Sequence, residues 1–329
     1  MTIQTHRVAS RGRDSVLKAC AIVLEEPRRL SVRELPLTAP GPGDLVVDVE
    51  WSGISTGTER LLWSGTMPPF PGLGYPLVPG YESVGRVIAV GSECTVPVGS
   101  RVFVSGASCY GKVRGLFGGA ASRLVVPQAK AMIIEESLGE QGILMALAAT
   151  AVHAIDSSDH SRLPDLVVGH GVLGRLLARV AIAKGADAPT VWEVEENRFD
   201  GATGYSVLHP DNDSRTDYSS VYDVSGAASI VDSIMPHLAR RGEVVLAGFY
   251  SGAVSFVFPP AFMREARLRI AAEWQPQDLL EANRLVSDGL LSLDGLITHR
   301  ARVDDAATAY RTAFEQAECL KMIMDWREH

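Results

Sequence analysis

Three glycines in the second half of the chain have the spacing of a phosphate-binding turn. Gly169, Gly171 and Gly174 follow the apolar residues 166–168 and precede a segment with one apolar helical face. Glycines there permit a tight turn and close approach of the backbone, so that free N–H groups at the start of a helix can face a pyrophosphate. We therefore predict a dinucleotide site formed by the whole loop, which comprises Gly169, His170, Gly171, Val172, Leu173 and Gly174.

An acidic residue after the next predicted strand indicates which dinucleotide binds. Glu193 lies roughly 20 residues beyond the first glycine, as is typical of this motif. A carboxylate there can accept the ribose hydroxyls and repels a 2′-phosphate, which favours NAD over NADP. Two alternatives stay open. Glu193 can be a solvated strand end, and Arg198 is near enough in sequence to reach a 2′-phosphate, although we expect the nearer carboxylate to dominate.

Two later segments end in small residues that suit the same cleft. "SVYDVSGAAS" and "GEVVLAGFYSG" are typical of strands that end at small residues. Because ligands of a doubly wound sheet bind outside the carboxyl ends of its strands, we predict that these ends line the cofactor cleft. The residues concerned are Ser225, Gly226, Gly248 and Phe249.

Composition limits the classes of function. The 329 residues are 46% hydrophobic and 21% charged, which is typical of a globular chain long enough for two domains. The net charge of -8 argues against nucleic acid as a partner, since phosphate binding needs clustered Lys and Arg. The four cysteines show no disulfide or metal spacing, and the apolar run of residues 19–24 is too short for a signal or a membrane span. We expect a cytoplasmic protein that is not transmembrane and binds a small molecule.

The pattern of elements divides the chain. Residues 18–127 consist of short apolar runs separated by Pro and Gly, which predicts an all-β half, and residues 141–155 have helical spacing. Strands and helices then alternate, and the tail from 278 onward indicates helix, extended segment, helix and strand. We predict an α/β protein with a β-rich domain (1–150, with a flexible arm at 1–16), a doubly wound nucleotide-binding domain (151–275) and a C-terminal segment (276–329) that returns to the first domain.

This order of parts, with the closing "LITHR…DDAATAY…MIMDW", resembles the medium-chain dehydrogenase/reductase superfamily over residues 18–327. The resemblance implies a GroES-like catalytic domain, a Rossmann domain and hydride transfer. It also implies a homodimer, because relatives commonly pair their last sheet strands, here near "LRIAAEW". Four stretches are similar to one member in particular, which oxidises the 3-(1-hydroxyethyl) group of a chlorin or bacteriochlorin to acetyl in bacteriochlorophyll synthesis: "SGISTGTER", "PGYESVGRVIAVG", "LFGGAASRLVVP" and "SGAASIVDSIMPHLARRGEVVLAGFYSG".

The positions that hold zinc in other members carry unsuitable residues here. Those members use a Cys, a His and a further Cys or acidic residue, and the matching positions are Ser55, Tyr81 and Ala146. A zinc site needs three thiolate, imidazole or carboxylate ligands plus water. Glu59 and Glu82 are the remaining possible ligands, and we expect no metal. In a substrate whose carbinol carbon is attached to a conjugated macrocycle, the charge that develops as hydride leaves is spread over the ring, which lessens the need for a metal.

A proton must still leave the hydroxyl group, and a positioned side chain should take it. Each candidate also has a purely structural interpretation. Glu82 can brace its loop or pair with an arginine, His153 can be a packed helix residue, and Tyr81 can fill the space of the missing imidazole and metal. The candidates are Ser55, Thr58, Glu59, Tyr81, Glu82 and His153.

Two loops suggest contacts with the substrate. Residues 108–122 are rich in glycine and carry Lys112 and Arg114 near Phe117, so the segment is either a mobile flap with cations for a propionate or an ordinary connecting loop. The Pro/Gly-rich residues 64–76 include Met67, Phe70 and Leu73, which suit a flat apolar ring.

Two other classes of function remain open at this stage. Zinc-free members of the superfamily include quinone and enone reductases, which usually take NADPH, and Glu193 argues against them. A non-catalytic nucleotide-binding protein is the second alternative, since the zinc ligands are missing.

Overall fold

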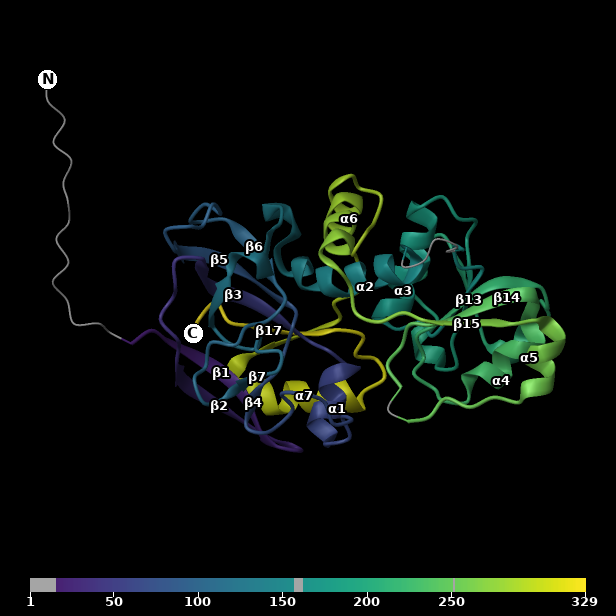
Figure 1. The fold of residues 1–329 in the computed structure, drawn as a ribbon, viewed down its shortest axis with the longest axis horizontal. Helices are drawn as coiled ribbons and strands as arrows, with labels where there is room; N and C mark the ends of the chain where they lie inside the picture. Colours follow the sequence, from purple (N-terminus) through teal and green to yellow (C-terminus); the bar gives the residue numbers. More distant parts are fainter. Residues whose placement is uncertain (1–15, 157–161, 251) are drawn as a thin grey trace, which may run out of the picture.

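The computed structural model describes residues 16–156, 162–250 and 252–329, so that the predicted arm lies almost entirely outside the described residues. A β-rich half and an α/β half lie side by side along the longest axis (Figure 1). Helices α2 (Met145–Asp156) and α6 (Pro276–Ser287) lie between them.

Two sheets form the β-rich half. The first has the order β2-β1-β4-β7 and the second the order β16-β17-β3-β5-β6-β9, with β8 paired to β3. The first sheet consists of β1 (Lys18–Glu26), β2 (Arg29–Pro36), β4 (Leu77–Val78) and β7 (Arg114–Gly115). The second consists of β3 (Asp44–Ile54), β5 (Ser83–Val90), β6 (Arg101–Val104), β8 (Arg123–Pro127), β9 (Ala131–Ile133), β16 (His299–Arg302) and β17 (Met322–Asp325). Helices α1 (Thr58–Ser64) and α7 (Ala306–Glu315) lie beside them.

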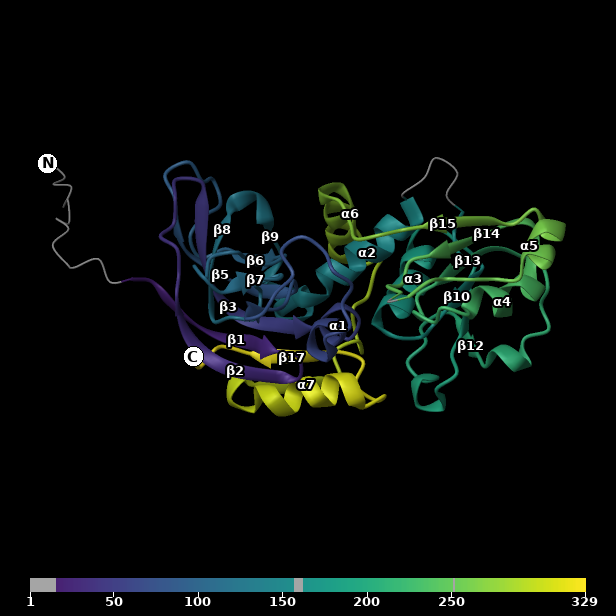
Figure 2. The ribbon, with the colours of Figure 1, turned by 60° about the horizontal axis from the view of Figure 1, so that its bottom comes forward.

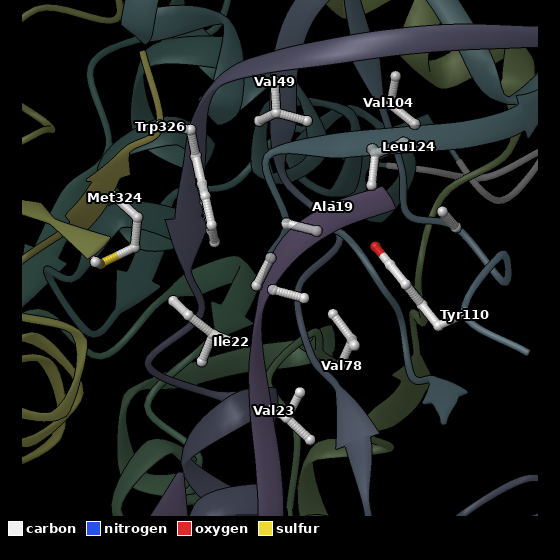
Figure 3. Close-up of a cluster of buried hydrophobic side chains, with 14 of the residues drawn as sticks. Ala19, Ile22, Val23, Val49, Val78, Val104, Tyr110, Leu124, Met324 and Trp326 are labelled. Carbon is white, nitrogen blue, oxygen red and sulfur yellow. The ribbon is translucent and has the colours of Figure 1, made fainter. Parts of the chain in front are cut away.

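The end of the chain is an integral part of this half. Strand β17 pairs antiparallel with β3, which places Met324 opposite Ser52. Figure 3 shows Met324 and Trp326 in the same apolar cluster as Ile22 of β1. The indole Nε1 of Trp326 donates a hydrogen bond of 2.9 Å to Ser52 Oγ. The C-terminal residues therefore complete the core that the N-terminal strands begin.

The α/β half is a six-stranded sheet in which every described pairing is parallel. Its order is β12-β11-β10-β13-β14-β15, so the strand order reverses at β10, where a doubly wound sheet binds its ligand. The strands are β10 (Leu166–Val168), β11 (Thr190–Trp192), β12 (Ser206–Leu208), β13 (Tyr218–Asp223), β14 (Leu238–Leu246) and β15 (Arg267–Ile270). Helices α3 (Val172–Ala183), α4 (Ile230–Ile234) and α5 (Phe258–Arg264) accompany them. The predicted α/β fold class is confirmed.

A single apolar cluster joins the two halves. It combines Trp51 of β3 and Ile323 of β17 with buried side chains of α2, α3 and α6. Among the described residues, one helical stretch, Glu136–Asp156, is long and apolar enough to cross a membrane, and it includes α2. Of the 18 residues in its most apolar window, 61% are buried within the protein, as expected of a core helix. Figure 2 shows α2 and α6 where the halves meet. The predicted domain boundaries near 150 and 275 stay a prediction.

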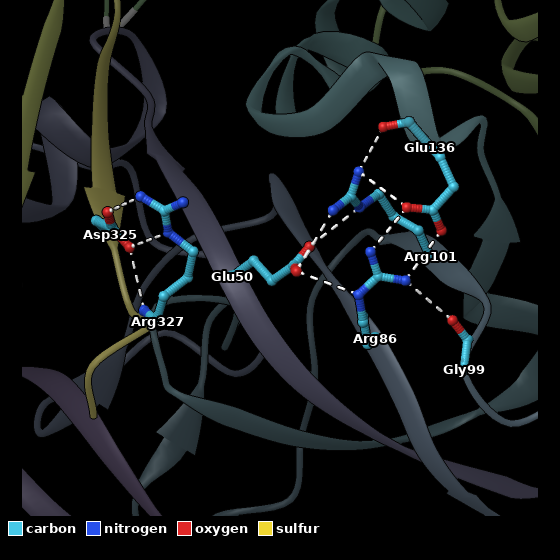
Figure 4. Close-up of polar contacts among 7 residues, drawn as sticks. All are labelled: Glu50, Arg86, Gly99, Arg101, Glu136, Asp325 and Arg327. Atoms are coloured by element: carbon cyan, nitrogen blue, oxygen red, sulfur yellow. Dashed lines mark hydrogen bonds and ion pairs between the residues drawn. The ribbon is translucent and has the colours of Figure 1, made fainter.

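A network of ion pairs ties the segment before α2 to the second sheet (Figure 4). Arg101 Nε donates to Glu50 Oε2 at 3.0 Å, and Arg86 Nη2 donates to Glu136 Oε2 at 2.7 Å. Glu136 begins the 3₁₀ segment Glu136–Leu144 that leads into α2. Because Arg86 and Glu136 are largely exposed, the network orients this segment more than it stabilises the fold.

Candidate active site and cofactor site

The glycine loop leaves the start of α3 open for a phosphate. Gly169 has φ 103°, and a Cβ on Gly174 would lie 1.8 Å from the Gly169 carbonyl oxygen, so both positions require glycine. Apart from its two chain neighbours, no atom of the described residues lies within 4 Å of a Cβ built on Gly171, the N-cap of α3. No side chain caps this helix, so the first N–H groups of its initial turn, which contains Val172 and Leu173, remain available to an anion. The residues present therefore fit a dinucleotide pyrophosphate.

Glu193 is not a solvated strand end. The side chain is 6% exposed, and its carboxylate accepts three backbone N–H groups. Oε1 accepts from Val194 and Glu195 at 2.8 and 3.0 Å, and Oε2 accepts from His170 at 2.9 Å. The N–H of His170, which we expected to face the pyrophosphate, is thus engaged by Glu193. Oε2 keeps capacity for one further donor, such as a ribose hydroxyl.

The His170 side chain locks the glycine loop to the segment after β11. Its Nδ1 lies 2.6 Å from the Arg198 carbonyl oxygen, so Nδ1 carries the proton and Nε2 accepts from the Tyr205 hydroxyl at 2.9 Å. Burial lowers the pKa of His170 to about 4, which keeps the ring neutral at pH 7. The buried Arg175 adds donations to the carbonyls of His170 and Arg198. Sequence reasoning missed Arg175 and Tyr205, because nothing in the motif specifies these partners.

The Arg198 guanidinium is directed away from the glycine loop. Its Nε donates to the Ala317 carbonyl oxygen at 3.0 Å, in the C-terminal segment. The charged side chains that hydrogen-bond to the loop are those of Glu193 and Arg175, which both contact the backbone of His170.

The strand ends predicted to line the cleft come together. A Cβ on Gly169 would lie 3.3 Å from Ser225 N, one on Gly248 would lie 3.3 Å from Gly226 N, and one on Gly226 would lie 3.2 Å from Phe249 O. Phe249 is exposed at this edge. Sequence reasoning missed the buried Asp223 at the end of β13, which accepts hydrogen bonds from Ser225 N and from the Tyr250 hydroxyl. The available signal was an acidic residue at the carboxyl end of a predicted strand, directly before the small residues of the cleft.

Ser55 and Tyr81, which the resemblance matches to two zinc-ligand positions, form a pair of hydroxyl groups in this structure. Ser55 Oγ and the Tyr81 hydroxyl lie 2.7 Å apart, and the Thr58 hydroxyl also bonds to Tyr81. We call Ser55 and Tyr81 the hydroxyl pair. Burial, together with the nearby charge of Glu82, raises the pKa of Tyr81 well above its ordinary value, so the phenol stays protonated. The ring of Phe117 meets that of Tyr81 edge-on, at 5.5 Å between centroids.

A buried carboxylate lies next to the hydroxyl pair. Glu59 Oε1 accepts the backbone N–H of Ser55 at 3.0 Å, and Oε2 accepts the Tyr310 hydroxyl at 3.0 Å. Burial raises the pKa of Glu59 to about 7, and the charge of Glu82 contributes to the increase. Glu59 is therefore able to gain or lose a proton near neutral pH.

Glu82 forms an ion pair with a lysine instead of the arginine that one interpretation suggested. Lys321 Nζ lies 2.5 Å from Glu82 Oε2 and also donates to the Ile54 carbonyl at 3.3 Å. Both side chains are almost completely buried, and Glu82 Oε1 has no hydrogen-bond partner within the described part of the chain. Lys321 directly precedes β17, and sequence reasoning missed it because its partner is far away in the chain.

His153 lies in a different environment from the other candidates. Its Nδ1 is 2.8 Å from Asp278 Oδ2, which also accepts the Gln275 N–H in the capping box of α6. Among the described residues, no recorded hydrogen bond connects His153 to the hydroxyl pair. This geometry favours the structural interpretation, in which His153 joins α2 to α6.

The donor groups do not suit zinc. Ser55 and Tyr81 share a hydrogen bond, Tyr81 resists ionisation, and Ala146 offers no donor. Within residues 16–156, 162–250 and 252–329, no group of three His, Cys, Asp or Glu side chains is placed to hold a metal ion.

Comparison with known proteins agrees with this description. Residues 41–136 match the alcohol dehydrogenase GroES-like domain. The 2-desacetyl-2-hydroxyethyl bacteriochlorophyllide A dehydrogenase of Rhodobacter capsulatus is 54% identical over 308 residues, covering 93% of this chain and 98% of the relative. The protein of the same name from Cereibacter sphaeroides is 52% identical over 316 residues, covering 94% and 99%.

Solved structures support the fold. A putative zinc-binding dehydrogenase from Sinorhizobium meliloti, bound to NADP, superposes with a TM-score of 0.79 at 23% identity and covers 94% of this chain and 99% of its own. A short chain alcohol dehydrogenase from E. coli CFT073, complexed with NADH, gives a TM-score of 0.79 at 22% identity, with coverage of 94% and 99%.

The fold and the nucleotide site together define a medium-chain dehydrogenase/reductase, an oxidoreductase that acts on CH–OH groups with a nicotinamide cofactor. Within that superfamily, the chain belongs to the 2-desacetyl-2-hydroxyethyl bacteriochlorophyllide A dehydrogenase family. Both levels of the resemblance drawn from the sequence are confirmed.

The buried ion pair makes a prediction about stability. Lys321→Met leaves Glu82 buried without its cation, and we expect the free energy of unfolding to fall by about 3–5 kcal/mol in urea denaturation at pH 7. The double variant K321M/E82L removes both charges and should recover most of this loss, because an apolar pair of similar size is often as stable. A K321M protein as stable as the wild type would contradict the assigned role.

Proposed function

We propose that the protein oxidises the 3-(1-hydroxyethyl) group of a chlorophyllide or bacteriochlorophyllide to 3-acetyl, with NAD as hydride acceptor and without zinc. Two near full-length relatives that carry the corresponding name support the substrate. The hydroxyl pair supports the metal-free chemistry, because the two positions that the resemblance matches to zinc ligands carry hydroxyl groups that bond to each other, 2.7 Å apart.

The residues of the site suggest how the hydroxyl group of the substrate is handled. When bound, the nicotinamide supplies the hydride acceptor. The protonated Tyr81 can hydrogen-bond to the carbinol oxygen, and Ser55 and Thr58 orient the phenol. As the hydride leaves, the alcohol proton becomes acidic, and the hydroxyl groups can pass it inward. Glu59, next to Ser55 and with a pKa near 7, is the proposed acceptor.

The direct test uses the pigment. Protein, NAD and a 3-(1-hydroxyethyl) bacteriochlorin should produce NADH together with a red shift of the long-wavelength band, because the new carbonyl is conjugated with the ring. A 3-vinyl pigment is the control. Activity should persist after chelator treatment, without stoichiometric zinc by elemental analysis. NADH formation from simple alcohols alone would refute the proposed substrate. Consumption of NADPH with quinones or enones, without oxidation of the pigment, would refute the proposed reaction. About one essential zinc per chain would refute the metal-free chemistry.

The assignment of the base predicts a pH profile. Glu59 can accept a proton only when ionised, and its raised pKa places that ionisation near pH 7. We expect kcat/KM for oxidation to rise with pH up to about 7 and then level off. Glu59→Gln should abolish this dependence and lower kcat by about 10²–10⁴-fold. His153→Gln is the matched control and should keep both rate and profile; the opposite result would make His153 the base.

The contacts of Glu193 support a preference for NAD over NADP. In Glu193→Gln, loss of the negative charge weakens the bond to the ribose and relieves the repulsion of a 2′-phosphate. We expect the ratio of kcat/KM for NAD to that for NADP to fall about ten- to hundredfold, which corresponds to one charge-assisted hydrogen bond. Arg198→Gln should leave the ratio nearly unchanged, because this side chain contacts Ala317. A wild type that prefers NADP would refute the assignment.

The edge strand β15 supports the proposed homodimer. It ends the six-stranded sheet, and its residue Ile270 is 78% exposed, while Leu268 lines a hollow together with Phe258 and Phe262 of α5. Exposed edges pair readily with a second copy. We expect a dimer by light scattering and a monomer for Ile270→Lys, with Leu280→Lys on α6 as a control that stays dimeric. A monomeric wild type would refute this. The four free cysteines are compatible with the proposed cytoplasmic location.

A further inference from the structure

A short strip of the chain, residues 112–117, runs beside the segment that carries Tyr81. Strand β7 pairs in parallel with β4, Arg114 opposite Leu77, and the N–H groups of Leu116 and Gly118 both donate to the Val78 carbonyl at 2.9 Å. The Phe117 carbonyl accepts from Ala107 N at 2.8 Å. The segment is therefore held in place by backbone hydrogen bonds, and not arranged as the loose flap that the sequence allowed. We call residues 112–117 the basic strip.

The basic strip ends at the hydroxyl pair. The Phe117 ring contacts Tyr81 edge-on and is 38% exposed, so one part of it faces Tyr81 and another part is free to contact a ligand. Partly buried side chains of the loop 65–76, including Phe70 and Leu73, pack on the apolar cluster that contains the neighbouring Leu116. An exposed aromatic side chain next to the proposed reacting hydroxyl group suits a flat conjugated ring.

The other end of the basic strip carries two positive charges without acidic partners. Lys112 and Arg114 are exposed, and neither takes part in an ion pair among the residues that the structure describes. Arg114 Nη1 makes one long contact, 3.5 Å, with the Tyr75 carbonyl oxygen. A Cβ on Gly74 would lie only 3.0 Å from Arg114 Cζ, so the glycine makes room for the guanidinium. Most of the donors on Arg114 thus remain available for an anion.

We propose that Lys112 and Arg114 bind the propionate carboxylate of the pigment while Phe117 contacts the macrocycle beside its hydroxyethyl group. This inference rests on the proposed function. A chlorophyllide carries an ionised propionate across the ring from the hydroxyethyl group, and an arginine binds a carboxylate through paired hydrogen bonds. Phe117 is three positions after Arg114, at most about 10 Å of extended chain. One pigment can therefore contact both ends of the basic strip.

The assignment has a consequence for specificity. An esterified propionate has no charge to offer, so the free acid should bind more tightly than its ester. Charge-assisted bonds of this kind change affinity by about ten- to hundredfold. Lys112 and Arg114 contact the pigment far from the reacting carbon. The preference for the free acid over the ester should therefore appear mainly in KM.

The experiment compares a 3-(1-hydroxyethyl) bacteriochlorin free acid with its methyl ester. For the wild type, kcat/KM should favour the acid about ten- to hundredfold. In K112Q/R114Q, KM for the acid should rise to that of the ester, with kcat for both compounds unchanged. K130Q/R311Q changes the net charge equally at two other exposed cations and should keep the wild-type preference. Equilibrium binding of both pigments, followed by fluorescence without cofactor, should show the same pattern.

The outcomes separate the two levels of the proposal. Equal rates for acid and ester in the wild type, or an unchanged preference in K112Q/R114Q, would refute the propionate site and leave the proposed function intact. A wild type that oxidises neither pigment would refute the proposed function, and the propionate site with it. Phe117→Ala should raise KM for acid and ester alike, because it removes a contact that both compounds share; an increase for the acid alone would contradict the assigned place of the ring.

Discussion

The contact between Lys321 and Glu82 is the constraint to which the rest of the site conforms. Both groups are almost fully buried, and removing two charges from water is costly unless they meet in good geometry. They meet only when β17 lies against β3, because Lys321 directly precedes β17. The same pairing places Trp326 in the core of the β-rich half. The end of the chain thus stabilises the fold and places the positively charged Lys321 beside Glu82.

Burial and the charges of Glu82 and Lys321 together determine how the neighbouring groups ionise. Burial is the main cause that raises the pKa of Glu59 to about 7; the negative charge of Glu82 adds to the increase, and the positive charge of Lys321 opposes it. The same surroundings disfavour a phenolate at Tyr81. The site therefore presents neutral hydroxyl groups to a ligand and keeps a carboxylate that can titrate beneath them. Such an arrangement is suited to moving a proton and poorly suited to holding a divalent cation.

The sequence predicted those parts of the structure that depend on residues close together in the chain. The glycine loop, the strand before it and the position of Glu193 all depend on neighbours within one βαβ unit, and each was located from spacing and apolar pattern. The sequence could not predict contacts between residues that are far apart in the chain. A single sequence does not show that the N–H of His170 serves Glu193, that Arg175 braces the loop, or that Lys321 reaches Glu82. These choices depend on how whole elements pack.

The shared core limits how the enzyme can recognise a large ring. Trp51 and Ile323 pack with α2 and α3 in one apolar cluster, so a wide separation of the two halves would expose surface that stabilises both. Domain closure is then an expensive means of selecting a substrate. The substrate is more easily selected by a surface segment that is held rigidly and presents charged and aromatic side chains. The basic strip meets this requirement, because backbone hydrogen bonds fix it against β4 while Lys112, Arg114 and Phe117 remain exposed.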